Sequence, residues 1–277
     1  MRTTSMFLMT VLAASFTFST SAQKKDDPKH TNYYKDVEEP VETKEVVIEF
    51  TNGVSRFDFL KFKAKFTNNT NDFLIVDPAK FKIKTDGVTH QPKEKAFILD
   101  PNDSKAKTID VKEGENFKAE EFEVSVDGFA LIPVDGKPTQ MSEFQLPAST
   151  NNMKSGNFEV NLKRVSQETK ETWAVFSIKY TGDGYGIVDP SRISIKTESG
   201  EQFANEFRKS KTILLEKGET KSVDAVFHIP AKVVDMQFAK LFIQWGECMV
   251  ETEAVALELD ESVTFTLDEA LTAEKNK

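Results

Sequence analysis

Cysteine and histidine are scarce in this sequence of 277 residues. It contains one cysteine, Cys248, and three histidines, His30, His90 and His228. A lone cysteine excludes an intramolecular disulfide, and no His or Cys residues have the spacing of zinc ligands. Neither His90 nor His228 stands near a Ser or Cys nucleophile with a glycine-rich elbow. The sequence therefore predicts a protein without catalytic residues, metal site or cofactor, and not an enzyme.

Tryptophan and tyrosine are also in short supply, and basic residues are fewer than acidic ones. There are 2 Trp and 4 Tyr against 23 Phe, and 36 Lys and Arg against 45 Asp and Glu, which gives a net charge of −9. Phenylalanine fills an interior without needing a hydrogen-bond partner, so the aromatic skew predicts packed cores. The excess of negative charge disfavours nucleic acid and anionic membrane surfaces as partners.

The apolar run near the N-terminus is too short to span a bilayer. It extends from Met6 to Phe18, short of the about 18–20 residues that a membrane helix needs. Arg2 precedes this run, and Thr20-Ser21-Ala22 follows it with the small residues of a cleavage site. Residues 1–22 are therefore a predicted signal peptide, and we expect a secreted or periplasmic protein without a membrane span. The polar stretch 23–43 is expected to be a disordered leader.

An internal repeat divides the rest of the chain into two copies. Residues 75–85, IVDPAKFKIKT, recur at 187–197 as IVDPSRISIKT, with seven of eleven positions identical. The match continues upstream, where Phe62 corresponds to Phe176. A duplication of this length predicts two related domains, residues 44–148 and 155–268, followed by a frayed tail at 269–277.

Within each copy, apolar and polar residues alternate with a period of two. Phe62, Ala64 and Phe66 alternate with lysines, and Phe158, Val160 and Leu162 alternate in the second copy. Turn signals separate these runs, as at Asn52-Gly53, Asp86-Gly87, Asp127-Gly128, Asp135-Gly136 and Lys217-Gly218. Strands of this kind bury one face and expose the other, as antiparallel sheets do. The predicted fold is all-β, with two tandem immunoglobulin-like antiparallel β-sandwich domains.

A family resemblance accompanies these patterns. An Asn-rich turn, an Asp-Pro step and the run Phe-x-Ile-x-Thr-Asp-Gly at residues 81–87 resemble exported bacterial immunoglobulin-like modules. Such modules serve as accessory domains of surface proteins. The shared motifs are structural turns, so the resemblance implies the fold and no particular chemistry.

The Asp-Pro steps at Asp77-Pro78 and Asp189-Pro190 occur in both copies. Calcium needs six to eight oxygen ligands, and no second acidic residue stands beside either aspartate in an Asp-x-Asp pattern. Asp accepts hydrogen bonds from the local backbone and Pro fixes φ, so both steps are predicted to open turns.

Two groups of residues are candidate binding sites. Lys61, Lys63 and Lys65 project from one predicted strand, and Lys82 and Lys84 from another. If all five share a face, they form a basic patch for an anionic glycan or an acidic partner. The alternative is a solvated face neutralised by cross-strand acids such as Glu121 and Glu123.

Tyr185 is the second candidate, within the glycine-rich run Gly182-Asp183-Gly184-Tyr185-Gly186. It presents either an aromatic ring for stacking on a sugar or a hairpin whose Tyr folds back on the sheet.

The sequence-based functional hypothesis is a non-enzymatic module of the cell envelope or extracellular space that binds a protein or acts as a spacer. The alternative is a carbohydrate-binding module associated with glycan processing. Duplication, the predicted export and the lack of catalytic groups support the first hypothesis, whereas Tyr185 and the lysines support the second.

Overall fold

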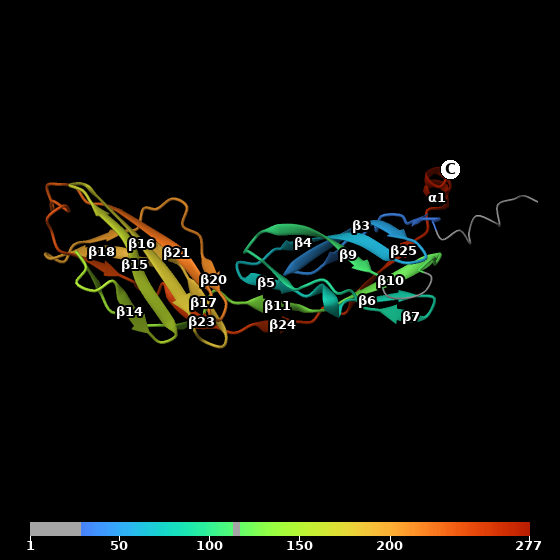
Figure 1. The fold of residues 1–277 in the computed structure, drawn as a ribbon, viewed down its shortest axis with the longest axis horizontal. Coiled ribbons are helices and arrows are strands. Elements are labelled where there is room, and N and C mark those ends of the chain that lie inside the picture. The colour runs from blue at the N-terminus through green and yellow to red at the C-terminus, as the bar shows by residue number, and fades with distance from the viewer. Residues whose placement is uncertain (1–28, 113–116) are drawn as a thin grey trace, which may run out of the picture.

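The computed structural model describes residues 29–112 and 117–277, so the predicted signal peptide lies outside the described residues. The described chain is almost entirely β-strand, with two short 3-10 turns and one α-helix, α1 (Glu269–Lys275). All strand pairs in it are antiparallel, which confirms the all-β sandwich prediction. Figure 1 shows two lobes arranged end to end along the long axis of the molecule. No helix among the described residues is long and apolar enough to cross a membrane.

The first lobe packs a sheet of order β1-β3-β4-β9, with β2 also on β3, against a second layer. The first sheet contains β1 (Asn32–Tyr33), β2 (Val41–Glu42), β3 (Val46–Ser55), β4 (Leu60–Asn68) and β9 (Ser104–Val111). One half of the second layer has the order β25 (Glu261–Thr266), β10 (Glu121–Val126), β6 (Lys82–Thr85), β7 (Val88–His90). The other half has the order β24 (Val255–Leu257), β11 (Phe129–Ile132), β5 (Phe73–Val76), β8 (Phe97–Leu99).

The second lobe repeats this strand order. Its first sheet is β14 (Asn152–Ser155), β15 (Phe158–Gln167), β16 (Glu171–Tyr180), β21 (Thr220–His228). One half of its second layer is β13 (Phe144–Leu146), β22 (Leu241–Gln244), β18 (Ser194–Thr197), β19 (Gln202–Ala204). The other half is β12 (Lys137–Pro138), β23 (Met249–Thr252), β17 (Tyr185–Val188), β20 (Ile213–Leu215). The sequence repeat therefore corresponds to two lobes of matching strand order, apart from one additional strand in the first sheet of the first lobe.

The two lobes exchange their edge strands. In the first lobe, the edge beside β10 and β11 is formed by β25 and β24, which follow the entire second lobe in sequence. In the second lobe, the same edge is formed by β12 and β13, which directly follow β11 of the first lobe. Each lobe is thus completed by a segment that the other lobe's chain supplies, as in a domain-swapped dimer with both halves on one chain.

This exchange corrects the expected boundaries at 44–148 and 155–268. Strands β24 and β25 belong to the first lobe, where Val263 and Phe265 join the core formed by residues from Tyr34 to Phe129. Strand β13 belongs to the second lobe, where Phe144 and Leu146 are buried. The alternation in the sequence predicts which face of a strand is buried, but it carries no information about which strand lies beside it.

The expected disordered leader is corrected from residue 29 onward. Strands β1 and β2 pair with β3, and the Tyr34 side chain is buried. The Tyr34 hydroxyl shares a hydrogen bond with Ser55 Oγ at 2.9 Å and donates one to the carbonyl oxygen of Ala119 at 2.8 Å. The polar composition of residues 23–43 predicts disorder, whereas the buried Tyr34 side chain anchors the described part of this stretch to the first lobe.

The tail at 269–277 is not frayed either, since α1 docks on the N-terminal strand. The Tyr33 backbone N–H donates to Thr272 Oγ1 at 2.9 Å, and the Thr31 N–H donates to Asn276 Oδ1 at 3.0 Å. The Asp268 side chain caps the helix by accepting from the Leu271 N–H. These long-range hydrogen bonds hold both ends of the described chain at one end of the molecule (Figure 1).

The predicted Phe-rich cores are present in both lobes. In the first core, Phe122 and Phe265 stack with ring centroids 4.5 Å apart. In the second, Phe176 meets Trp245 edge to face at 4.9 Å. A third, smaller apolar cluster joins the lobes, with the buried side chains Phe73, Ile132, Ile187, Leu214 and Val250.

Candidate functional site

The five candidate lysines do not share a face. Lys61, Lys63 and Lys65 are exposed on β4, which pairs with β3 and β9. Lys82 and Lys84 are exposed on β6, which pairs with β10 and β7 in the opposite layer of the sandwich. The basic patch considered from sequence is therefore split between two sides of the first lobe.

Each group of lysines also has acidic partners nearby. Lys65 Nζ lies 2.7 Å from Glu49 Oε2, and Lys61 lies opposite Asp110 across the sheet. On the other side, Lys84 lies opposite Glu123. This arrangement favours the interpretation of two solvated faces with cross-strand neutralisation.

Tyr185 lies at the junction of the two lobes. It begins β17, opposite Thr252, and packs half-buried against the junction cluster. Burial, with a smaller contribution from Glu216, raises the pKa of its hydroxyl. The ring of Tyr185 therefore packs in the contact between lobes. The run before it connects β16 to a strand of the other layer, so the expected hairpin is not formed.

Both Asp-Pro steps open 3-10 turns, Pro78–Lys80 and Pro190–Arg192. Asp189 Oδ1 accepts from the Ser191 N–H at 3.0 Å, and its other oxygen accepts from Arg192 Nε at 3.1 Å. Among residues 29–112 and 117–277, no group of three or more His, Cys, Asp and Glu side chains is placed to hold a metal ion.

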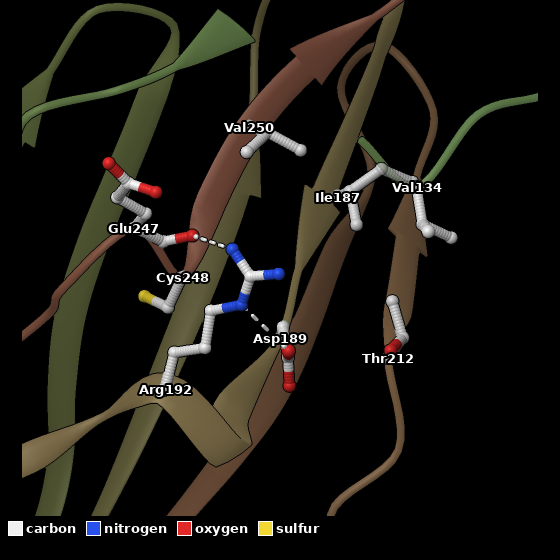
Figure 2. Close-up of a pocket in the computed structure, with 8 residues that line it drawn as sticks. All are labelled: Val134, Ile187, Asp189, Arg192, Thr212, Glu247, Cys248 and Val250. Carbon is white, nitrogen blue, oxygen red and sulfur yellow. Dashed lines mark hydrogen bonds and ion pairs between the residues drawn. The ribbon is translucent and has the colours of Figure 1, made fainter. Parts of the chain in front are cut away.

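The Asp189 turn borders a small cavity at the junction (Figure 2). Arg192 lies between Asp189 and the Glu247 carbonyl, to which Nη1 donates at 3.3 Å. The cavity volume is about 40 Å³, which is room for a few water molecules. Cys248 lines it, and burial raises the pKa of its thiol to about 12. The cavity is therefore too small for a substrate-sized molecule.

A larger groove of about 410 Å³ follows the outer border of the junction. Its apolar floor includes Phe73, Ile98 and Leu214, and its rim carries Asp100, Lys211 and Glu216. The floor residues belong to the contact that joins the lobes.

His90 and His228 both make contacts with neighbouring side chains. His90 Nε2 lies 3.1 Å from Thr85 Oγ1, and its ring packs on Phe117. His228 bridges Glu171 and Glu206, with nitrogen-to-oxygen distances of 3.0 and 3.1 Å.

The outer face of the sheet β14-β15-β16-β21 carries a tryptophan and two valines beside one basic and one acidic residue, a group that sequence reasoning missed. We call this group the Trp173 face; its members are Arg164, Trp173, Val175, Asp224 and Val226. The odd-numbered residues of β16 point outward, because the even-numbered ones from Thr172 to Tyr180 are buried. Trp173 lies opposite Val226, and Val175 lies between Arg164 and Asp224.

Two contacts fix the indole of Trp173 on this face. Trp173 Nε1 donates a hydrogen bond to Asp224 Oδ1 at 2.9 Å. The guanidinium carbon of Arg164 lies 4.3 Å from the ring centroid. The side chain is therefore rigid and is covered on one side by a cation.

The first lobe carries charges at the corresponding positions. There Asp110 lies opposite Lys61, as Asp224 lies opposite Val175 in the second lobe. Two residues further along, Lys112 pairs with Asp110 at 2.6 Å, whereas the second lobe has Val226. The aromatic before Lys61 is Phe59, with Lys61 Nζ 5.1 Å from its ring centroid. Two lysines of one copy thus correspond to two valines in the other.

The sequence contains the signal for this difference. In an alternating strand, valine or tryptophan at an outward position indicates an apolar group on the solvent-exposed face. Aligning the two copies of the repeat shows where one copy has such a residue and the other has a lysine. The pairing of β16 with β21, which brings Val175 and Val226 onto one surface, follows only from the structure.

Comparisons with known proteins give no family. No protein-family model matches the chain, and no curated protein matches it. Among solved structures, the crystal structure of AerE from Microcystis aeruginosa is aligned over 86% of this chain and 99% of that chain, with 9% sequence identity and a TM-score of 0.11. A likeness at this level carries no argument about fold or function.

Proposed function

We propose that this protein is a non-enzymatic exported module that binds a protein or serves as a spacer in the cell envelope or extracellular space. The reciprocal exchange of edge strands is the observation that carries this proposal. It ties two sandwich lobes into one elongated body, which suits a part that sets distance or presents surfaces rather than one that encloses a substrate.

The crossing between lobes supports a stiff rod. The chain crosses twice, once between β11 and β12 and once between β23 and β24. These segments pair with each other on both sides of the crossing, as Ala130 with Ala256 and Lys137 with Glu251. Two antiparallel connections and the apolar junction cluster oppose a hinge at this point.

The state of the ionisable side chains supports a non-catalytic role. The Cys248 thiol has a pKa of about 12, far above that of a nucleophilic cysteine. His228 is placed between two carboxylates, and His90 is packed on Phe117.

The proposal for export rests on the sequence of residues 1–22. The carbohydrate alternative loses its main support, because Tyr185 packs in the junction and the lysines lie on two faces.

Two measurements on the full chain test the proposal. Spin labels at Ser222→Cys and Ser262→Cys, one in each lobe, should give a single narrow distance distribution, and a broad one would contradict the rod. Cross-linking of tagged protein in the native envelope fraction should capture a reproducible protein, or none for a pure spacer. Substrate turnover that a single polar substitution abolishes would overturn the non-enzymatic assignment.

A further inference from the structure

We propose that the Trp173 face is the docking site of the second lobe, and that its occupant is a protein segment presenting a carboxylate next to an apolar side chain. This inference rests on the proposed binding function and adds the surface and the chemistry of the partner.

The comparison between the two copies is the first argument. The first lobe has the exposed residues Lys61 and Lys112 where the second lobe has Val175 and Val226. Charged residues at such positions keep a sheet face hydrated. Their replacement by valine leaves half-buried apolar surface around Trp173, which is typical of a surface that meets a partner.

The rigidity of Trp173 is the second argument. Its hydrogen bond to Asp224 and its stack with Arg164 hold the indole in one position before any partner arrives. A side chain that is already ordered loses little conformational entropy on binding. Trp and Arg are also the side chains that most often dominate protein interfaces.

The Arg164 guanidinium determines the charge of the partner. Within residues 29–112 and 117–277 it makes no hydrogen bond or ion pair, although the stack fixes its plane. A planar guanidinium with unpaired N–H groups matches a carboxylate in a bidentate geometry. The chain's net charge of −9 opposes acidic partners at long range, but physiological salt screens charges beyond about 8 Å. The nearby Asp224 carboxylate accepts the indole N–H of Trp173, which leaves the Arg164 guanidinium as the charge that this face offers to a partner.

The valines determine that the occupant is a protein segment rather than a glycan. Val175 and Val226 offer no hydrogen bonds to sugar hydroxyls, and Arg164 covers one face of the indole. An aliphatic or aromatic side chain placed over the two valines would bury apolar surface from both partners.

The test uses a displayed library of random twelve-residue peptides, selected on the full chain. Selected sequences should combine Asp or Glu with a neighbouring apolar residue. The double variant Val175→Lys/Val226→Lys gives the second lobe the residues that the first lobe has at these two positions. With a circular dichroism spectrum that matches the wild type, it should weaken these peptides at least tenfold. The matched control Ser125→Lys/Ser262→Lys adds the same charge on a distant face of the first lobe and should leave their affinity unchanged.

A double-mutant cycle tests the carboxylate. Arg164→Gln should weaken the parent peptide at least tenfold but have little effect on a peptide whose Asp or Glu is replaced by its amide. Additive losses would overturn the assignment of Arg164.

Other outcomes overturn the proposal in distinguishable ways. Selection that yields no peptide, or peptides that bind Val175→Lys/Val226→Lys equally well, would exclude this face. Binding of an acidic glycan that the same double variant abolishes would assign the face to a glycan. An envelope partner that cross-links equally to the double variant would leave the proposed function standing and refute only its location.

Discussion

Cys248 illustrates how burial controls chemistry at the scale of one residue. Its side chain is 1% exposed in the second core, and desolvation, the largest cause, raises the pKa of the thiol to about 12. The reactive thiolate is therefore nearly absent at neutral pH.

We predict that Cys248 resists iodoacetamide at pH 8 in the native protein and reacts fully in denaturant. Mass spectrometry of alkylated protein measures this, with the exposed Ser222→Cys variant as the reactive control. Rapid labelling of native Cys248 would mean that the second core opens.

Glu94 is a partly buried carboxyl beside another acid. Its Oε1 accepts from the Asp110 N–H at 2.7 Å, while Oε2 is buried without a hydrogen-bond partner among the described residues. Desolvation is the largest cause that raises its pKa, and Asp110 adds to it. The folded chain therefore retains the proton at pH values where the unfolded chain has released it, and Glu94 lowers stability as pH rises above about 4.5.

We predict that Glu94→Gln unfolds at a higher temperature than the wild type at pH 7, because it removes this cost. The difference should shrink toward pH 4, where both states of Glu94 hold the proton. Thermal scans by circular dichroism at several pH values measure it. A difference independent of pH would show that the effect is not ionisation.

At the scale of the element, one glycine allows the close packing of the crossing ribbon, the two chain segments that pass between the lobes from β11 to β12 and from β23 to β24. Gly136 lies just before β12, and a Cβ there would collide with the backbone carbonyl of Glu251 and lie 3.1 Å from Thr252 Cβ. The strands at the crossing can approach this closely because position 136 has no side chain.

We predict that Gly136→Ala destabilises the protein by about 1–3 kcal/mol, the usual cost of a forced contact. Chemical denaturation measures the loss. Lys137→Ala, at the next position on an exposed site, should change stability little. Equal stability of Gly136→Ala and the wild type would mean that the ribbon shifts freely.

The exchange of strands sets behaviour at the scale of the whole molecule. The first lobe depends on the last segment of the chain, because Phe265 is fully buried between Phe50, Phe62 and Phe122. Both tryptophans, Trp173 and Trp245, lie in the second lobe, so their fluorescence reports that lobe alone.

We predict that removing residues 254–277 unfolds the first lobe and leaves a cooperative tryptophan transition from the second. Far-ultraviolet circular dichroism should lose about half of its β signal, since two lobes of similar size share the strands. Removing only residues 269–277 is the control and should retain both lobes. Loss of the tryptophan transition in the longer truncation would show that the lobes fold only together.

The sequence by itself determined the local structure of this protein. The alternation of residues such as Phe62, Ala64 and Phe66 with lysines is sufficient for strands and for their buried faces, because side chains on a strand point to opposite sides in turn. The repeated Asp-Pro steps predicted the turns that η2 (Pro78–Lys80) and η3 (Pro190–Arg192) form, and the repeat predicted two units.

Tertiary structure alone decided which strands are neighbours, and with that the boundaries and the candidate site. Val263 and Phe265 have the same alternation whichever lobe they complete, so only packing reveals that they close the first core. Likewise, Lys61 and Lys82 belong to strands with the same alternation but lie on opposite layers, and Val175 and Val226 share one surface only because β16 pairs with β21. The physical reason is that periodicity is a property of one strand, whereas a surface or a core is made by several strands that are distant in the chain.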